Sequence, residues 1–442
     1  MSNKKTVDEL LSFIKKSPTA FHAIDEIRKT LKSSGFEELL EGSKFKIKEG
    51  GSYFVTRNNS SIIAVKIGKS ISDYGFNITA SHSDSPTFRI KENAELDVKG
   101  RYTQLNTEGY GGMLCATWFD KPLSIAGRVL VKKGDRLETR LIAIDRDLVV
   151  IPNVAIHMNR QVNDGFAYNK QIDMLPLFGE GKPEKGALKE LIAKELGVSA
   201  DDIYGSDLFL YNRTHQSVWG REGEYMSSPR LDNLECAYAS LQGFLEGEND
   251  KTVQVYVCYD NEEVGSGTKQ GAASTFLSDI LARINLALGK TEEDFKRAVA
   301  KSFLLSCDNA HAVHPNHPEK TDDTNCSYMN GGIVIKSHAG QKYCSDGVSI
   351  AVFKAVCEKA DVPYQFFANR SNELGGSTLG NISMSQLSMN AVDIGLAQLA
   401  MHSSYETAGV KDCDYLIKAC KVFYDSSIDE IDSFNLSISY RD

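Results

Sequence analysis

The sequence contains no apolar run that approaches the ~20 residues needed to span a bilayer. Its N-terminus, MSNKKTVDELLSFIKKS, has neither the long apolar stretch nor the small-residue cleavage site of a signal peptide. The Leu and Phe residues of this segment recur at helical spacing and predict an amphipathic helix. These absences argue against a membrane partner and against secretion.

Clustered cysteines and concentrated basic charge are also missing. The nine cysteines are scattered without a CxxC motif, and the apolar neighbours of Cys258 and Cys307 indicate reduced core thiols in a cytoplasmic protein. Any bound metal must therefore be held by histidine and carboxylate. The net charge of −9 and the lack of a basic stripe argue against a nucleic-acid partner.

The 442 residues exceed what one hydrophobic core usually accommodates, so we expect two domains. Residues 7–40 predict two amphipathic helices, broken around residues 17–19. Strands are predicted at 52–56, 61–68 and 74–80. This first stretch, residues 1–92, is interpreted as the first part of an α/β catalytic domain.

Residues 93–226 have a different pattern. Short β-branched runs separated by turn residues predict strands at 128–132, 140–144 and 147–151. One helix is predicted at 186–196. We interpret 93–226 as an inserted β-rich domain.

After this segment, strands and helices alternate. The predicted elements are a strand at 253–259, a helix at 271–288, a strand at 303–307 and a helix at 350–359. Such alternation indicates a mostly parallel sheet with helices on both faces. Residues 227–442 are therefore interpreted as the second part of the α/β domain.

Polar side chains follow the predicted strands of the α/β parts. They are His82 and Asp84 after 74–80, Asp260, Glu262 and Glu263 after 253–259, Asp308 and His311 after 303–307, His402 after a possible strand at 392–395, and Asp232 just after the insertion. One such residue means little, because Asp is common in turns and helix caps. Several of them at the carboxyl edge of one sheet form a specific pattern, because functional groups of open α/β sheets gather there.

This set matches the needs of a two-zinc site. Two zinc ions about 3.5 Å apart need nitrogen and oxygen ligands, a bridging carboxylate and an open position for water. The candidate ligands are His82, Asp232, Glu263, Asp308 and His402. Glu262, placed with Glu263 in a loop, suits the role of the base that takes and returns the proton of the water. Co²⁺ or Mn²⁺ can occupy similar sites.

The sequence resembles the M18 family of metallo-aminopeptidases, the group that includes aspartyl aminopeptidases and a yeast vacuolar aminopeptidase. The resemblance spans nearly the whole chain. It is carried, in order, by SPTAFHA (17–23), SHSDSP (81–86), IPNVAIHMNR (151–160), SSPRLDNL (227–234), DNEEVGS (260–266), DNAHAVHPNHPEK (308–320), GGIVIK (331–336) and MHS (401–403). Several blocks in the right order are far more specific than any one of them.

The resemblance implies a role for each residue. One zinc would be held by His82, Asp232 and Asp308, and the other by Asp232, Glu263 and His402. Asp232 would bridge the two ions and Glu262 would be the general base. Contacts to a peptide substrate with a free N-terminus are implied for His157, His311, Lys336 and Tyr343.

The resemblance also implies an oligomeric state and a preference for certain N-terminal residues of the substrate. The inserted domain would mediate dimerisation, six dimers would form a dodecamer, and His157 would reach a neighbouring subunit's site. The family name suggests N-terminal Asp or Glu, for which Lys336 offers a cation, but the family also includes enzymes that favour neutral residues. Two departures from the family pattern, in RSNELGGSTLG (370–380) and at Tyr405, concern the substrate pocket rather than the metal ligands.

Simpler explanations exist for single residues. His82 fits a turn histidine, Asp232 a helix N-cap, the Glu262–Glu263 pair a solvated charge pair and Lys336 a surface lysine. For the whole protein, the alternatives are a neutral or basic N-terminal preference, a carboxypeptidase or deacylase with a similar di-zinc core, and a catalytically idle self-assembling shell. The absence of HExxH and GxSxG leaves single-zinc helical proteases and serine hydrolases unsupported.

Overall fold

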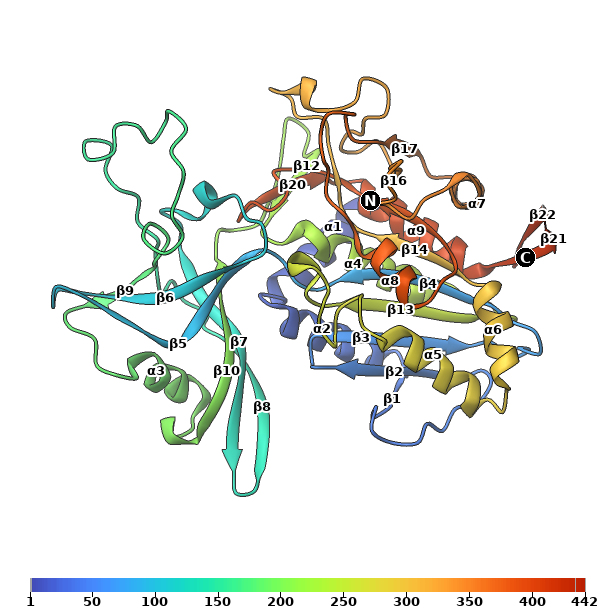
Figure 1. Ribbon diagram of the computed structural model, residues 1–442, viewed down its shortest axis with the longest axis horizontal. Coiled ribbons are helices and arrows are strands. Elements are labelled where there is room, and N and C mark those ends of the chain that lie inside the picture. Colours follow the sequence, from blue (N-terminus) through green and yellow to red (C-terminus); the bar gives the residue numbers. More distant parts are fainter. Residues whose placement is uncertain (1, 434, 442) are drawn as a thin grey trace.

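A nine-stranded mixed sheet organises the right-hand half of the computed structural model, which describes residues 2–433 and 435–441 (Figure 1). Across the sheet the strands are β1 (Glu37–Glu38), β2 (Ser52–Arg57), β3 (Ser61–Ile67), β13 (Val253–Tyr259), β4 (Phe76–His82), β14 (Phe303–Cys307), β18 (Asn390–Gly395), β16 (Ile333–Lys336) and β17 (Tyr364–Phe367). The central strands β13, β4, β14 and β18 are parallel, so their carboxyl ends meet at one edge. The β2–β3, β3–β13 and β18–β16 pairs are antiparallel. The predicted α/β fold is confirmed as a mixed α/β fold.

Helices cover both faces of this sheet. One face packs against α1 (Ser2–Lys16), α2 (Ala20–Ser33), α4 (Leu231–Glu246), α7 (Gly347–Ala360) and α9 (Asp412–Asp425), and the other against α5 (Phe276–Ala287), α6 (Glu292–Ala300) and α8 (Leu379–Gln386). In β13, Tyr256 and Cys258 join the first core and Val255 and Val257 the second. Burial on both sides explains why this strand is an almost continuous apolar run.

The left-hand half of Figure 1 is a six-stranded antiparallel sheet built from residues 87–212. Its strands, in order, are β8 (Arg136–Ala143), β7 (Leu123–Lys133), β10 (Ile203–Asn212), β5 (Thr87–Val98), β6 (Tyr102–Tyr110) and β9 (Leu177–Glu180). Helix α3 (Ala187–Leu196) packs on it, and the buried side chains form a hydrophobic cluster of their own. The domain boundaries at 93 and 226 stay predictions.

Two smaller sheets complete the chain. A five-stranded sheet contains β11 (Ser217–Trp219), β12 (Tyr225–Ser228), β20 (Glu406–Gly409), β19 (Ala397–Leu399) and β15 (Ala310–His311). A hairpin of β21 (Ser426–Asp432) and β22 (Asn435–Tyr440) projects at the far right of Figure 1. The five-stranded sheet contains the strand that precedes the predicted ligand Asp232 and the strands on either side of His402.

Two predicted elements differ from the structure. The helix predicted at 271–288 begins only at Phe276, because Gly271 lies against the backbone of Ser266 and Ser274 caps the first turn with its hydroxyl. The strand predicted at 147–151 is reduced to isolated bridges of Val149, Val150 and Ile151. Pro152 follows this segment and has no N–H with which to extend a ladder.

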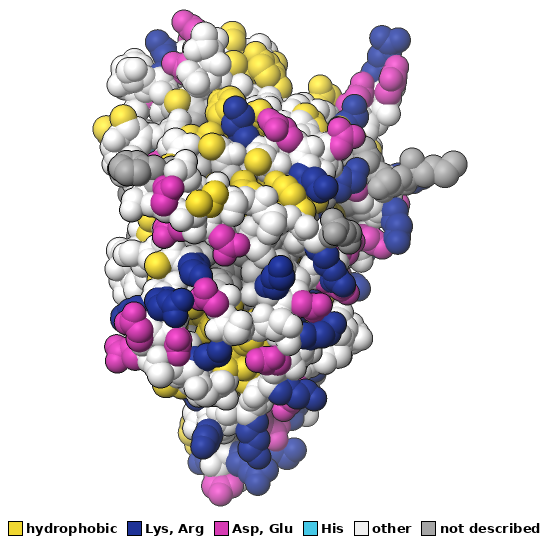
Figure 2. Space-filling view, turned by 90° about the vertical axis from the view of Figure 1, so that its right-hand side faces the viewer, with side chains coloured by type: hydrophobic (Ala, Val, Ile, Leu, Met, Phe, Trp, Pro, Cys, Tyr) yellow, Lys and Arg dark blue, Asp and Glu magenta, His cyan; other side chains and the backbone are white. Residues whose placement is uncertain are grey.

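All nine cysteines are free, and Cys258 and Cys307 are fully buried. No helix in the described part of the chain is both long and apolar enough to cross a bilayer. Figure 2 shows the end of the molecule opposite the six-stranded sheet, where acidic and basic side chains are interspersed.

Candidate metal centre

The predicted ligands converge at the carboxyl edge of the central strands. His82 is the last residue of β4, Asp308 directly follows β14, and Glu263 lies in a 3₁₀ turn (Glu262–Val264) just after β13. Asp232 is the second residue of α4, where its backbone is not helical. His402 follows β19 and has a left-handed backbone with φ 66°. Five segments distant in sequence therefore supply one cluster.

Asp232 lies between the two histidines. Its Oδ1 is 3.5 Å from His82 Nε2, and its Oδ2 is 3.5 Å from His402 Nε2. Asp308 Oδ1 is 3.4 Å from His82 Nε2, and Glu263 Oε2 is 3.2 Å from His402 Nε2. The side chains thus form two triads that share Asp232, each with its ligand atoms within 4.8 Å of one another.

The residues present fit a pair of zinc ions. Within the described chain, the buried oxygens Asp232 Oδ1 and Glu263 Oε1 have no hydrogen-bond partner. A buried carboxylate oxygen without a partner is costly, and a bound cation supplies the missing interaction. Imidazole nitrogens and carboxylate oxygens are donors that zinc prefers, and no thiolate is needed.

The charge of the cluster shifts its protonation equilibria. Burial, followed by the neighbouring Asp308 carboxylate, raises the pKa of Glu262 to about 8. Burial opposes protonation of His402, but its hydrogen bond to Asp232 raises the pKa of the imidazole to about 9. Burial likewise opposes ionisation of Asp232, but the neighbouring imidazoles of His402 and His82, each 3.5 Å away, lower the pKa of this carboxyl. The crowding of these carboxylates destabilises their ionised forms, and a bound divalent cation would offset that repulsion.

Both histidines are held so that Nε2 faces the cluster. His82 Nδ1 lies 3.1 Å from the carbonyl oxygen of Asp84, and His402 Nδ1 lies 2.6 Å from that of Gly112. A ring that donates Nδ1–H to a carbonyl has its Nε2 lone pair free for a metal. Gly112 belongs to the segment that follows β6, so the six-stranded half of the molecule orients one candidate ligand.

Two further carboxylates hold the backbone around the ligands. Asp84 accepts the N–H groups of Glu262 and Glu263, each at 3.2 Å, and the hydroxyl of Tyr110 at 2.7 Å. Sequence reasoning named Asp84 only as one of several candidates after β4.

Glu406 accepts the N–H of Asp232 at 3.0 Å and that of His402 at 2.8 Å. Its side chain is only 1% exposed. Sequence reasoning did not find Glu406. It lies four residues beyond His402 in MHSSYE, and no spacing rule marks it.

A cavity of about 150 Å³ opens beside the cluster, and the structure brings three of the four predicted substrate residues to it. Its lining includes His82, Asp232, Glu262, Asp308, His311, Lys336 and Tyr343. Lys336 is buried rather than on the surface: its ammonium donates to the carbonyl oxygens of Asp308 and Asn309 at 2.9 and 3.3 Å. It also lies 5.4 Å from the centre of the Tyr343 ring.

The fourth predicted substrate residue is elsewhere. His157 lies on the exposed segment 152–173, which projects from the six-stranded sheet at the upper left of Figure 1 and does not line this cavity. Neither Asn372–Leu374 nor Tyr405, the two departures from the family pattern, lines the cavity, although Gly376, Ser377 and Thr378 of the 370–380 segment do. Leu374 is 86% exposed, and the hydroxyl of Tyr405 donates to the carbonyl of His215.

Comparisons with known proteins agree with this geometry. A family model described as Aminopeptidase I zinc metalloprotease (M18) matches residues 13–424. The Probable M18 family aminopeptidase 2 of Clostridium novyi (strain NT) is 50% identical over 431 residues, which cover 96% of this chain and 100% of that protein.

Solved structures are similar over nearly the whole chain. A chain of the cryo-EM structure of the Ape4 and Nbr1 complex has a TM-score of 0.92 and 37% identity, covering 96% of this chain and 86% of that chain. The S. cerevisiae mApe1 dodecamer has a TM-score of 0.82 and 25% identity, covering 95% and 97%. The matching family model and the relative identical at half its positions show that this chain belongs to the M18 family of zinc metallo-aminopeptidases.

Proposed function

We propose that this aminopeptidase holds two zinc ions, with Asp232 as the bridging ligand and Glu262 as the general base. The observation that carries the proposal is the pair of triads around Asp232, whose two oxygens face different histidines. His82 and Asp308 complete one ligand set, and Glu263 and His402 the other.

The metal ligands and Glu262 have different roles in the proposed hydrolysis. When bound, the zinc ions polarise the scissile carbonyl and lower the pKa of water. Glu262 lines the cavity next to His82 and Asp308, where it takes the proton of the attacking water and returns it to the leaving amine. The backbone N–H of Glu262 donates to Asp84, which holds its carboxylate in position for both transfers.

The cavity favours a small acidic N-terminal side chain. Lys336 places an ammonium in the cavity wall, where it donates to two carbonyl oxygens and lies 3.9 Å from Asp308 Oδ2, and its positive charge would attract a substrate carboxylate. Tyr343 and His311 border the same space. This wall supports cleavage after an N-terminal Asp or Glu. The alternative is a preference for neutral N-terminal residues, and the assay below distinguishes the two.

Assembly is the second part of the proposal. The segment 152–173 exposes Val154, Ile156 and Met158, at 51%, 47% and 79%, and a contiguous set of exposed apolar residues is typical of a surface that a partner covers. We assign the six-stranded sheet to dimerisation and His157 to a neighbouring subunit's site. The likeness to the S. cerevisiae mApe1 dodecamer supports a dodecamer of six dimers.

Two variants test the centre. Glu262→Gln should bind two zinc ions per chain and lose most turnover, whereas Asp232→Ala should lose zinc as well. The exposed Glu222→Gln serves as a matched control. Turnover is measured on free and N-blocked aminoacyl substrates with acidic, neutral and basic N-terminal residues. Substantial turnover by Glu262→Gln would refute its role, and cleavage of neutral residues in preference to Asp and Glu would refute that of Lys336.

A further inference from the structure

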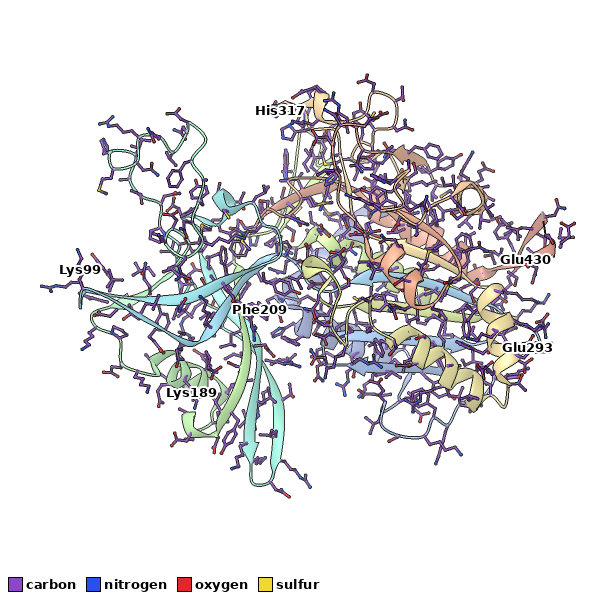
Figure 3. All side chains as sticks on the ribbon, in the orientation of Figure 1. Lys99, Lys189, Phe209, Glu293, His317 and Glu430 are labelled. Carbon is purple, nitrogen blue, oxygen red and sulfur yellow. The ribbon has the colours of Figure 1, made fainter. Side chains whose placement is uncertain are left out.

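A second and larger cavity, of about 480 Å³, lies at the junction of the two halves of the molecule. The nine-stranded half contributes residues 18–21 and 229–230, and the six-stranded half contributes residues of β5, β6, β7 and β10. Phe209 of β10 is labelled in Figure 3 and lies between the two sheets. The sequence blocks SPTAFHA and SSPRLDNL therefore meet at a site for which peptide hydrolysis provides no role beyond that of Asp232.

Aromatic rings form much of the cavity wall. They belong to Phe21, Tyr110, Trp118, Phe209 and Tyr211. The rings of Tyr110 and Phe209 meet edge to face at 5.7 Å, and the guanidinium of Arg128 lies 4.4 Å above the ring of Phe21. Such walls suit a flat apolar body, because aromatic pairs favour edge-to-face and offset contacts.

Arg230 places an unpaired positive charge in this wall. Its Nε and Nη2 donate to the carbonyl oxygens of Ser17 and Ile14 at 3.1 and 3.2 Å. In residues 2–433 and 435–441, no carboxylate forms an ion pair with this guanidinium and its Nη1 makes no hydrogen bond. A guanidinium stays charged at neutral pH, so Arg230 brings a fixed positive charge to the cavity. A half-buried cation without an ion-pair partner favours an anion beside it.

Most of the nearby carboxylates are committed elsewhere. Asp207 binds Arg89 and Arg128 at 3.1 and 2.7 Å. Glu406 accepts two backbone N–H groups of the metal centre. Burial, followed by the charge of Asp84, raises the pKa of Asp260 to about 7, so this carboxyl is partly neutral at neutral pH. None of these carboxylates is hydrogen-bonded to Arg230, so its Nη1 is available to a ligand.

We propose that this cavity is a binding site for a small aromatic monocarboxylate, whose carboxylate pairs with Arg230 and whose ring lies among the aromatic side chains. Nη1 of Arg230 supplies a charge-assisted hydrogen bond to the carboxylate. Asp232 lines both this cavity and the one beside the metal ligands, but the proposed binding uses Arg230 and the aromatic wall and does not depend on the proposed hydrolysis. Because Arg230 is two residues from Asp232, an occupant also contacts the segment that positions the candidate bridging ligand.

Trp118 provides the readout of binding. The chain has two tryptophans, of which Trp118 lines the cavity and Trp219 is exposed, so Trp219→Phe leaves one reporter. This protein is titrated with 3-phenylpropionate and with the isosteric neutral 3-phenylpropionamide. The acid should give a saturable change in fluorescence, and the amide should bind about tenfold more weakly or worse, because it lacks the charge that pairs with Arg230.

Two variants and one kinetic measurement complete the test. Arg230→Met should abolish binding, while Arg221→Met, which removes an exposed arginine nearby, should leave the affinity unchanged. Ala20→Leu keeps Arg230 but fills the cavity from the start of α2, and should weaken binding about tenfold. Equal binding of acid and amide, no binding at millimolar concentrations, or full binding by folded Arg230→Met or Ala20→Leu would overturn the proposal. Competition between the acid and a peptide substrate would also overturn it, because it would place the acid at the metal centre.

Discussion

Replacing Glu406 by Gln should weaken zinc binding without unfolding the protein. The two oxygens of this buried carboxylate accept the N–H groups of Asp232 and His402. A glutamine of the same shape has one acceptor oxygen, and its amide nitrogen would face the second N–H as another donor. One of the two candidate zinc ligands would therefore lose its backbone anchor.

The magnitude follows from the hydrogen bond that is lost. A hydrogen bond contributes about 0.5–1.5 kcal/mol, and a buried N–H left without a partner costs about 1–3 kcal/mol. His402 also has a left-handed backbone, φ 66°, which persists only where the surroundings hold it. If the lost hydrogen bond destabilises the conformation that binds zinc, the zinc affinity should fall by roughly 10- to 100-fold.

Competition with a chelator of known affinity measures the effect directly. The activity of Glu406→Gln as a function of free zinc should show the same loss, with recovery of turnover at high zinc. Glu224→Gln is the matched control, because Glu224 also accepts a backbone N–H, that of Glu222, but away from the ligands. Unchanged zinc affinity in Glu406→Gln, or an equal loss in Glu224→Gln, would refute the assignment of Glu406 as an anchor.

Two other predictions test groups beyond the ligands. Tyr110→Phe removes the hydroxyl that donates to Asp84 and should lower kcat/KM about tenfold with the melting temperature nearly unchanged, whereas Tyr102→Phe, exposed on the same strand, should have no effect. Burial lowers the pKa of His22 from 6.5 to about 4, so the unfolded chain binds more protons between these values and stability should fall by up to about 3 kcal/mol as the pH drops from 6.5 to 4. Urea unfolding of His22→Gln should lack this dependence, and an equal slope in both proteins would contradict it.

The convergence of the ligands could be predicted from sequence because it follows from strand direction. His82 and Asp308 lie at the carboxyl ends of apolar runs long enough to be buried strands. Parallel neighbours bring such ends to one edge whatever their order in the sheet. The order itself, with β13 between β3 and β4, could not be predicted, because the central strands are buried on both faces and their own residues do not specify which strand lies beside them.

The supporting residues could not be predicted for a different reason. Glu406 is 174 residues from Asp232, and Tyr110 is 151 residues from Asn261, whose side chain donates to its hydroxyl. An acidic residue in a short strand has the same local pattern whether it faces solvent or a ligand's backbone. Only the tertiary arrangement separates these cases, so spacing rules find the ligands and miss their anchors.

This dependence on distant contacts gives the six-stranded half a part in the metal centre that its sequence does not suggest. Its segment 110–117 contacts the ring and the carbonyl of His402 through Gly112 and Leu114, and Tyr110 binds Asp84. The candidate ligand His402 is therefore held by the six-stranded half. So is Asp84, which accepts the backbone N–H groups of Glu262 and Glu263. Because the same sheet is the one we assign to dimerisation, we expect a change in subunit packing to alter the position of His402.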